Sequence, residues 1–167
     1  GSLATRSGSE PPKVLVQMGQ NYAYSSLDEA YAGLDPDDAV DDLNAAYGLE
    51  LSGDAAIYSS GRINWQLVNN EILISRFQET GELEDIDGVV AHLYSKAPEI
   101  ETPRNNDLWQ IEQAWLDKNP DLEVHVTEWN QKGNTGVFDE ATDYGLYQAH
   151  EMLNIVETFM EQGVDAA

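Results

Sequence analysis

Three short apolar runs, separated by stretches with helical periodicity, limit the folds open to this chain more than any other feature. The runs are 13–18, 89–94 and 122–128, and proline, glycine or aspartate residues flank them. Short apolar runs with such boundaries are typical of buried strands. Strands that alternate with helices favour right-handed βα units and a parallel sheet. The sequence therefore predicts an α/β fold.

The stretches between the runs carry the start and stop signals of helices. One helix is predicted to begin at Asp35-Pro36-Asp37-Asp38, where acidic side chains suit the amino end, and to stop at Gly48. Further helices are predicted over 64–78, 105–118 and 143–162. The buried stripe of the last helix is expected to consist of Leu146, Ala149, Leu153, Val156 and Met160.

The number of predicted strands indicates a piece of a larger structure. Three parallel strands are too few for the sheet to be covered on both sides, and 164–167 resembles the entry to a further strand. Residues 1–12 have no apolar core and are interpreted as a tag or linker. The structural unit is therefore expected to span 13–167, and the amino terminus gives no information on localisation.

Composition narrows the classes of partner. With 167 residues and 41% apolar residues, the chain can form one domain with a real core. There are 31 acidic and 8 basic residues, giving a formal net charge of −23. Such a surface repels phosphate backbones, so no nucleic-acid partner is expected. No apolar run reaches 18 residues, so no membrane span is expected either. The absence of cysteine excludes disulfides and thiolate chemistry.

Motifs for metals and cofactors are missing from the sequence. The acidic cluster that begins at Asp35 fails the EF-hand pattern, because Ala39 stands at its fifth position and no glycine follows. No His-x-x-x-His or Glu-x-x-His pattern occurs, and no glycine-rich loop or nucleophile elbow follows a strand. We therefore expect no metal and no cofactor.

The strongest candidate for chemistry is Glu128, at the end of the run 122–128. In parallel α/β proteins catalytic groups gather where strands end and βα loops begin. His92 and Tyr94 end the preceding run in the same way, and His125 is expected on the opposite strand face from Glu128. The alternative is that Glu128 caps a strand or pairs with Lys132. The candidate ligand-binding residues are His92, Tyr94, Trp129, Asn130 and Gln17.

Two motifs together resemble a known family. Val89-Val-Ala-His92-Leu-Tyr94, a helix, and then Val124-His-Val-Thr127-Glu128-Trp129-Asn130 resemble the second half of a clan A glycoside hydrolase barrel, close to β-xylosidases and α-L-arabinofuranosidases. The resemblance covers 13–167 and implies a partial TIM (β/α)8 barrel, from about the fifth strand to the seventh helix. It also implies a carbohydrate substrate and a secreted parent enzyme.

The resemblance assigns roles to individual residues. Glu128 looks like the nucleophile of a retaining mechanism, while His92 and Tyr94 look like groups that position it and contact the sugar. Trp129 resembles a sugar-facing platform, although a packing role fits equally well. A retaining enzyme needs two carboxyl groups about 5–5.5 Å apart, one as nucleophile and one as proton donor. A hydrogen-bond donor beside the nucleophile would favour its charged form.

The proton donor is where the sequence departs from the family. Family members carry it in an Asn-Glu pair at the end of the fourth strand, and the pair here is Asn70-Glu71. The helical pattern of 64–78 runs through that pair, which also lies too close to His92 in the sequence. We therefore expect Glu71 on a helix surface, a fragment inactive by itself, and open sheet edges that favour self-association or pairing with the missing barrel half.

Two other classes of function stay open. A non-catalytic carbohydrate-binding or interaction module would use the same cleft, with Trp129, Tyr94, Tyr22 and Tyr24 stacking on sugar rings but without turnover. An acidic domain that binds a partner protein would show neither sugar binding nor turnover.

Overall fold

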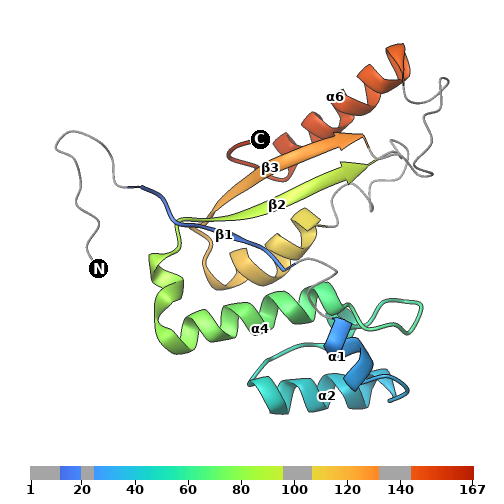
Figure 1. Ribbon diagram of the computed structural model, residues 1–167, viewed down its shortest axis with the longest axis vertical. Coiled ribbons are helices and arrows are strands. Elements are labelled where there is room, and N and C mark those ends of the chain that lie inside the picture. Colours follow the sequence, from blue (N-terminus) through green and yellow to red (C-terminus); the bar gives the residue numbers. More distant parts are fainter. Residues whose placement is uncertain (1–11, 20–24, 96–106, 132–143) are drawn as a thin grey trace.

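The centre of the molecule is a parallel three-stranded sheet in a computed structural model that describes residues 12–19, 25–95, 107–131 and 144–167 (Figure 1). Its strands β1 (Leu15–Gln17), β2 (Gly88–Ser95) and β3 (Glu123–Gln131) lie side by side in sequence order. Both pairings are parallel. The predicted strands and the α/β class are therefore confirmed. The expected tag or linker lies almost wholly outside the described residues.

The second edge of β3 pairs with the last residues of the chain. The Val126 amide donates to the Ala166 carbonyl at 2.8 Å, and the Asp165 amide donates to the Val124 carbonyl at 2.9 Å. This short segment runs parallel to β3. β3 is therefore flanked on both sides along this part of its length, as the strand-like character of 164–167 predicts.

The helices before β2 are α1 (Ser25–Ala30), α2 (Pro36–Tyr47), α3 (Gly53–Ala56), α4 (Trp65–Thr80) and the 3₁₀ helix η2 (Glu82–Asp85). Capping fixes the ends of the two long ones. Asp35 accepts a hydrogen bond from the Asp37 amide at the start of α2, and Asn64 accepts one from the Leu67 amide at the start of α4. Gly48 and Gly81 end these helices with positive φ angles of 67° and 77°.

After β2 the chain is helical from 107 to 118, with the π-helix η3 (Ile111–Leu116) inside it, and α6 (Gly145–Glu161) follows β3. These two helices and α4 bury their apolar side chains against the same face of the sheet. The core residues are Met18, Ile74, Val89, Ala91, Leu93, Ile111, Trp115, Val124, Val126, Ile155 and Phe159. On the other face Gln17 and Tyr94 are exposed. Among the described residues, helices therefore cover only one face of the sheet.

A buried amide ties β1 to two helices. The Asn70 Oδ1 atom accepts hydrogen bonds from the Gly19 amide and from the Trp115 indole, both at 2.8 Å. Its Nδ2 atom donates to the carbonyls of Gln66 and Gly19. Asn70 is fully buried, and both polar atoms of its side chain have hydrogen-bond partners. The side chain therefore stabilises the fold, whereas a buried amide without partners would lower the free energy of unfolding. Asn70 therefore has a structural role.

The position of α6 is as predicted, but its predicted buried stripe is wrong. Leu146 and Met160 are 91% and 79% exposed, and Leu153 and Val156 also face outward. The buried residues are Glu151, Ile155 and Phe159. The Phe159 ring meets the Trp129 ring edge to face, with 5.3 Å between the ring centroids. The helix has two apolar stripes, and the aromatic contact with β3 helps to select the one that packs.

A smaller core joins α1 and α2 to the start of α4. Leu43, Trp65 and Val68 are buried in it, and Leu27 and Tyr31 pack against them. Figure 1 shows α1 and α2 beside α4, at the end of the molecule away from β3. No helix in the described part of the chain is long and apolar enough to cross a membrane.

Candidate functional site

A bulge in β3 decides which way Glu128 points. Ala91 pairs with Val126, but the next residue of β2, His92, pairs with Glu128, so Thr127 is an extra residue in the strand. Side chains on a regular strand alternate between faces, which would place Glu128 with Val126 on the helix side. The extra residue reverses the alternation. Glu128 therefore shares the open face of the sheet with His92.

Three polar side chains converge at the carboxyl ends of β2 and β3. The Tyr94 hydroxyl donates a hydrogen bond to Glu128 Oε2 at 2.9 Å, and the His92 Nδ1 atom lies 3.7 Å from the same oxygen. The Glu128 side chain is 57% exposed. His92 and Tyr94 are two residues apart on β2 and so face the same side. The structure thus brings together the three residues that the sequence singled out.

The contact with Glu128 changes the acidity of Tyr94. The hydrogen bond to the carboxylate raises the pKa of the Tyr94 hydroxyl above its usual value, and partial burial and the negative charge of Glu128 act in the same direction. A raised pKa keeps the phenol protonated throughout the neutral range. Tyr94 is therefore a persistent donor to one oxygen of the carboxylate, and no described residue hydrogen-bonds the other oxygen.

The remaining candidate residues lie at different places around this group. Gln17 is level with Val90 and is exposed, so it faces the same side as His92 but lies nearer the amino end of β2. Asn130 is level with Tyr94, and its Oδ1 atom accepts a hydrogen bond from the Gln131 amide at 2.8 Å. Both side chains border the open face of the sheet.

Trp129 faces the helical layer. Its contact with the Phe159 ring places it on the opposite face of β3 from Glu128, so the structure does not bring it to the candidate site. This geometry favours the packing alternative for Trp129. Lys132, the alternative partner of Glu128, lies outside the described residues.

His125 is on the same face of the sheet as Glu128, and the sequence-based expectation that it faces the other way is wrong. It pairs with Val90, two residues before His92, and the bulge at Thr127 produces the shared orientation. The His125 Nε2 atom lies 2.9 Å from Glu123 Oε2. Alternation alone missed this residue, because it contains no signal for a bulge.

A second charged group lies at the amino end of β3. Lys13 forms an ion pair with Glu123. This hydrogen bond and the one to His125 lower the pKa of the Glu123 carboxyl. The pair is exposed to solvent, so it contributes little to stability. Glu123 is thus an ionised carboxylate at the opposite end of the strand from Glu128.

Glu71 belongs to helix α4, as the sequence predicts, but its side chain is half-buried instead of lying fully on the helix surface. Burial raises the pKa of its carboxyl, and Lys118 partly offsets that effect. Lys118 and Asp117 precede the start of β3, so Glu71 lies near the amino end of that strand, whereas Glu128 lies near its carboxyl end. Glu71 therefore does not supply a second carboxyl group beside Glu128. Among the described residues, no three acidic or histidine side chains gather as a metal site would require.

Comparisons of the chain with protein-family models, with curated proteins and with solved structures found no match. The case for a function therefore depends on the geometry of the site.

Proposed function

We propose that this chain is part of a retaining glycoside hydrolase with a (β/α)8 barrel, in which Glu128 is the nucleophile. The observation that carries the proposal is the convergence of Glu128, Tyr94 and His92 at the carboxyl edge of a parallel sheet. Catalytic groups of barrel enzymes occupy this edge. The substrate class is a polysaccharide or oligosaccharide.

The geometry suits nucleophilic attack by a carboxylate. Tyr94 holds Oε2 of Glu128, and the other carboxylate oxygen is left to approach the anomeric carbon of a sugar. His92 would hold the orientation of the same carboxylate and contact the sugar hydroxyls. In the retaining mechanism a second carboxyl group, about 5–5.5 Å away, protonates the leaving oxygen. In this proposal that group comes from the remainder of the barrel.

The arrangement of the elements also supports a barrel. The strands follow one another in sequence order, and the described helices that pack on the sheet do so on one face. A doubly wound fold would instead place helices on both faces. The uncovered apolar stripe of α6 lies on a helix beside β3, where a neighbouring helix would pack in a complete barrel.

The nucleophile role has a direct test that does not need the missing proton donor. A 2,4-dinitrophenyl xyloside or arabinoside carries a leaving group that departs without protonation. Attack by the Glu128 carboxylate forms the glycosyl ester as the bond to dinitrophenolate breaks. Mass spectrometry of peptides from the treated chain should locate the sugar on Glu128.

The matched variants for this test lie on one strand. Glu128→Gln should abolish labelling, whereas Glu123→Gln, on the same face of β3, should leave it unchanged. An unlabelled native chain, or equal labelling of the Glu128→Gln variant, contradicts the assigned role.

A non-catalytic carbohydrate-binding module is the second candidate. The observation that favours it is the lack of a second carboxyl group beside Glu128 among the described residues. This candidate predicts heat on titration with an oligosaccharide but no covalent sugar on Glu128. Titration calorimetry combined with the labelling experiment separates the two functions.

A further inference from the structure

A narrow cleft of about 220 Å³ lies between the helix 107–118 and the carboxyl end of α6. Its floor consists of the buried apolar side chains Leu108, Ile111 and Val124. Val124 is the second residue of β3, so the cleft lies near the amino end of that strand, whereas Glu128 lies near its carboxyl end. The cleft is therefore separate from the Glu128 group, and the proposed glycosidase reaction does not use it.

Each wall of the cleft carries an exposed glutamate. Glu112 follows Leu108 by four residues and precedes Leu116 by four, so these three lining side chains share one side of their helix. Glu112 and Leu116 belong to the π-helix η3, and π-helical turns are frequent at functional sites. Glu161 lines the cleft from the last turn of α6. No described residue forms an ion pair with either glutamate. The cleft thus combines an apolar floor with a carboxyl group on each side.

The position of Glu161 is electrostatically unfavourable within the chain itself. The carboxyl end of a helix carries partial negative charge, so a cation is favourable there and an acidic side chain is not. α6 has no basic residue in its last turn. A positive group beside Glu161 would therefore interact favourably with the side chain and with the end of the helix. The cleft is a place where this chain gains from a cation that another molecule supplies.

The size of the cleft limits what can occupy it. Small-molecule sites usually measure about 300–1,000 Å³, so a cleft of about 220 Å³ fits one side chain better than a whole ligand. Lysine and arginine bury an apolar stem while the charged head stays near water. The arginine guanidinium is a planar fork with several donors and can bond two carboxylates, whereas the lysine ammonium acts as a point charge. An apolar floor between two glutamates therefore matches arginine.

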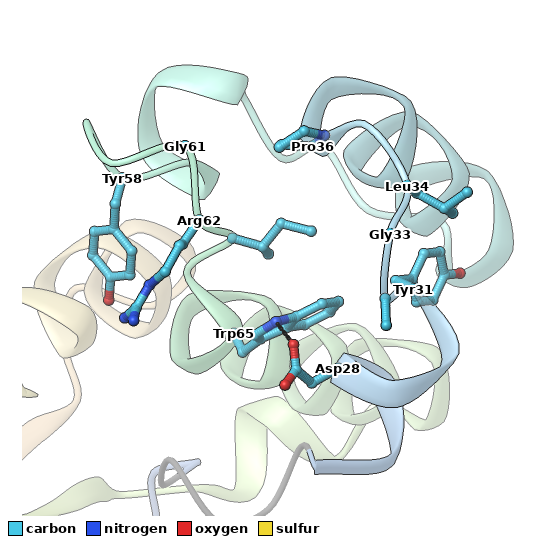
Figure 2. Close-up of a pocket in the computed structure, with 11 residues that line it drawn as sticks. Asp28, Tyr31, Gly33, Leu34, Pro36, Tyr58, Gly61, Arg62 and Trp65 are labelled. Atoms are coloured by element: carbon cyan, nitrogen blue, oxygen red, sulfur yellow. Dashed lines mark hydrogen bonds between the residues drawn. The ribbon is translucent and has the colours of Figure 1, made fainter.

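A larger pocket beside Trp65 lacks a group of this kind (Figure 2). It measures about 450 Å³ and lies between α1, the start of α2 and the segment that leads into α4. Asp28 lies behind the Trp65 indole, whose Nε1 atom donates a hydrogen bond to it at 2.8 Å. Figure 2 shows the Arg62 guanidinium beside the Tyr58 hydroxyl and directed away from the hollow. Neither charged group can select a ligand in that pocket, so its size alone does not define a site.

Net charge favours a basic partner over a second copy of the chain. A formal charge of −23 attracts cationic proteins at long range and repels identical chains. We propose that the cleft between the helix 107–118 and α6 is a docking site for an arginine side chain of a basic partner protein. The stem of the arginine covers the apolar floor, and the guanidinium bonds Glu112 and Glu161. The inference does not depend on the proposed function.

Methyl NMR can locate the docking with a small probe in place of the partner. The probe is the peptide acetyl-Ala-Arg-Ala-amide, titrated at about 0.15 M salt into the chain with labelled isoleucine, leucine and valine methyl groups. The signals of Ile111 and Leu116 should shift, whereas those of Val68, in the smaller core, should not. The citrulline counterpart keeps the stem but loses the charge and should produce no shift. The lysine counterpart should bind more weakly than the arginine peptide.

Matched variants separate the cleft from the net charge. Glu112→Gln and Glu161→Gln should each raise the peptide concentration at half of the shift about threefold, as expected for an exposed ion pair. Glu157→Gln removes the same charge from an exposed position of α6 outside the cleft and should change it little.

Three results would overturn the docking site: no shift of Ile111 and Leu116, equal binding of the citrulline peptide, or equal weakening by all three glutamate variants. Equal binding of the lysine peptide would overturn the choice of arginine.

Discussion

At the scale of single residues, the contact between Tyr94 and Glu128 carries most of the chemistry. The phenol proton lies between an oxygen that holds it and a carboxylate that accepts it, which is the physical reason for the raised pKa of Tyr94. The contact joins neighbouring strands at an exposed edge, so its removal should change the reactivity of Glu128 without disturbing the core.

Tyr94→Phe tests this contact in the labelling reaction. The variant keeps the ring and loses the donor, so the rate of sugar transfer to Glu128 should fall about tenfold, the lower end of the range for a hydrogen bond to a charged group. Thermal unfolding should be nearly unchanged because the side chain is exposed. An unchanged labelling rate would show that Tyr94 does not position the nucleophile.

The pKa of Tyr94 provides a test without any sugar. In the native chain its titration, followed by NMR of the labelled ring carbon beside the hydroxyl, should lie above the usual tyrosine value. Glu128→Gln removes the negative charge and should return the pKa of Tyr94 toward that value. The other seven tyrosines of the chain serve as internal references. A pKa of Tyr94 that is the same in the native chain and in Glu128→Gln would contradict the geometry of the site.

Glu71 is expected to make stability depend on pH. Burial raises its folded pKa above its unfolded pKa, so the folded state binds more protons between the two values, and stability falls as the pH rises through that interval. Glu71→Gln should therefore raise the urea midpoint at pH 7, and the gain should vanish below about pH 4. Glu84→Gln, at an exposed position in η2, is the matched control. A lower midpoint for Glu71→Gln at pH 7 would contradict the prediction.

At the scale of elements, local sequence signals predicted where the helices begin and end, whereas long-range packing decided which face of the sheet each strand side chain occupies. Asp35, Gly48, Asn64 and Gly81 act within a few residues of themselves, so the sequence was sufficient to place the ends of α2 and α4. The bulge at Thr127 depends on pairing with β2, a partner that lies more than thirty residues away. For this reason the strand and Glu128 could be predicted, but the face of His125 could not.

Deleting Thr127 tests the bulge. If it is the extra residue, the deletion makes the pairing regular, and Glu128 and Trp129 keep their faces. The raised pKa of Tyr94 should therefore persist in the shortened chain. Deleting Leu93 from β2, where the pairing is regular, should turn Tyr94 to the other face and abolish that shift. Loss of the shift on deleting Thr127 would contradict the pairing seen here.

The inward face of α6 can be checked by two neighbouring truncations. Phe159→Ala should cost about 3–5 kcal/mol, because it empties a buried site beside Trp129. Met160→Ala should change the free energy of unfolding by less than about 0.5 kcal/mol, as expected for an exposed position. Urea titrations of the two variants measure the difference. A larger loss of stability for Met160→Ala than for Phe159→Ala would instead support the buried stripe that helical periodicity predicts.

At the scale of the whole molecule, long-range repulsion opposes the tendency of apolar surface to associate. The formal charge of −23 acts between copies over about 30 Å at 0.01 M salt but over only about 3 Å at 1 M. The outer face of α6 presents Leu146, Leu153 and Met160 to solvent. Burial of such side chains is favourable at any salt concentration, and salts that strengthen it add to the effect. The balance should therefore tip toward association as salt is added.

Sedimentation velocity at the two salt concentrations tests this balance. The chain should sediment as a monomer at about 0.01 M salt and form dimers or larger species at about 1 M. Leu153→Lys places a charge in the middle of the exposed stripe and should prevent association, whereas Glu157→Gln alters the net charge equally but leaves the stripe apolar. Association that persists in Leu153→Lys would assign the contact to the sheet edges, where unpaired backbone groups offer the alternative surface.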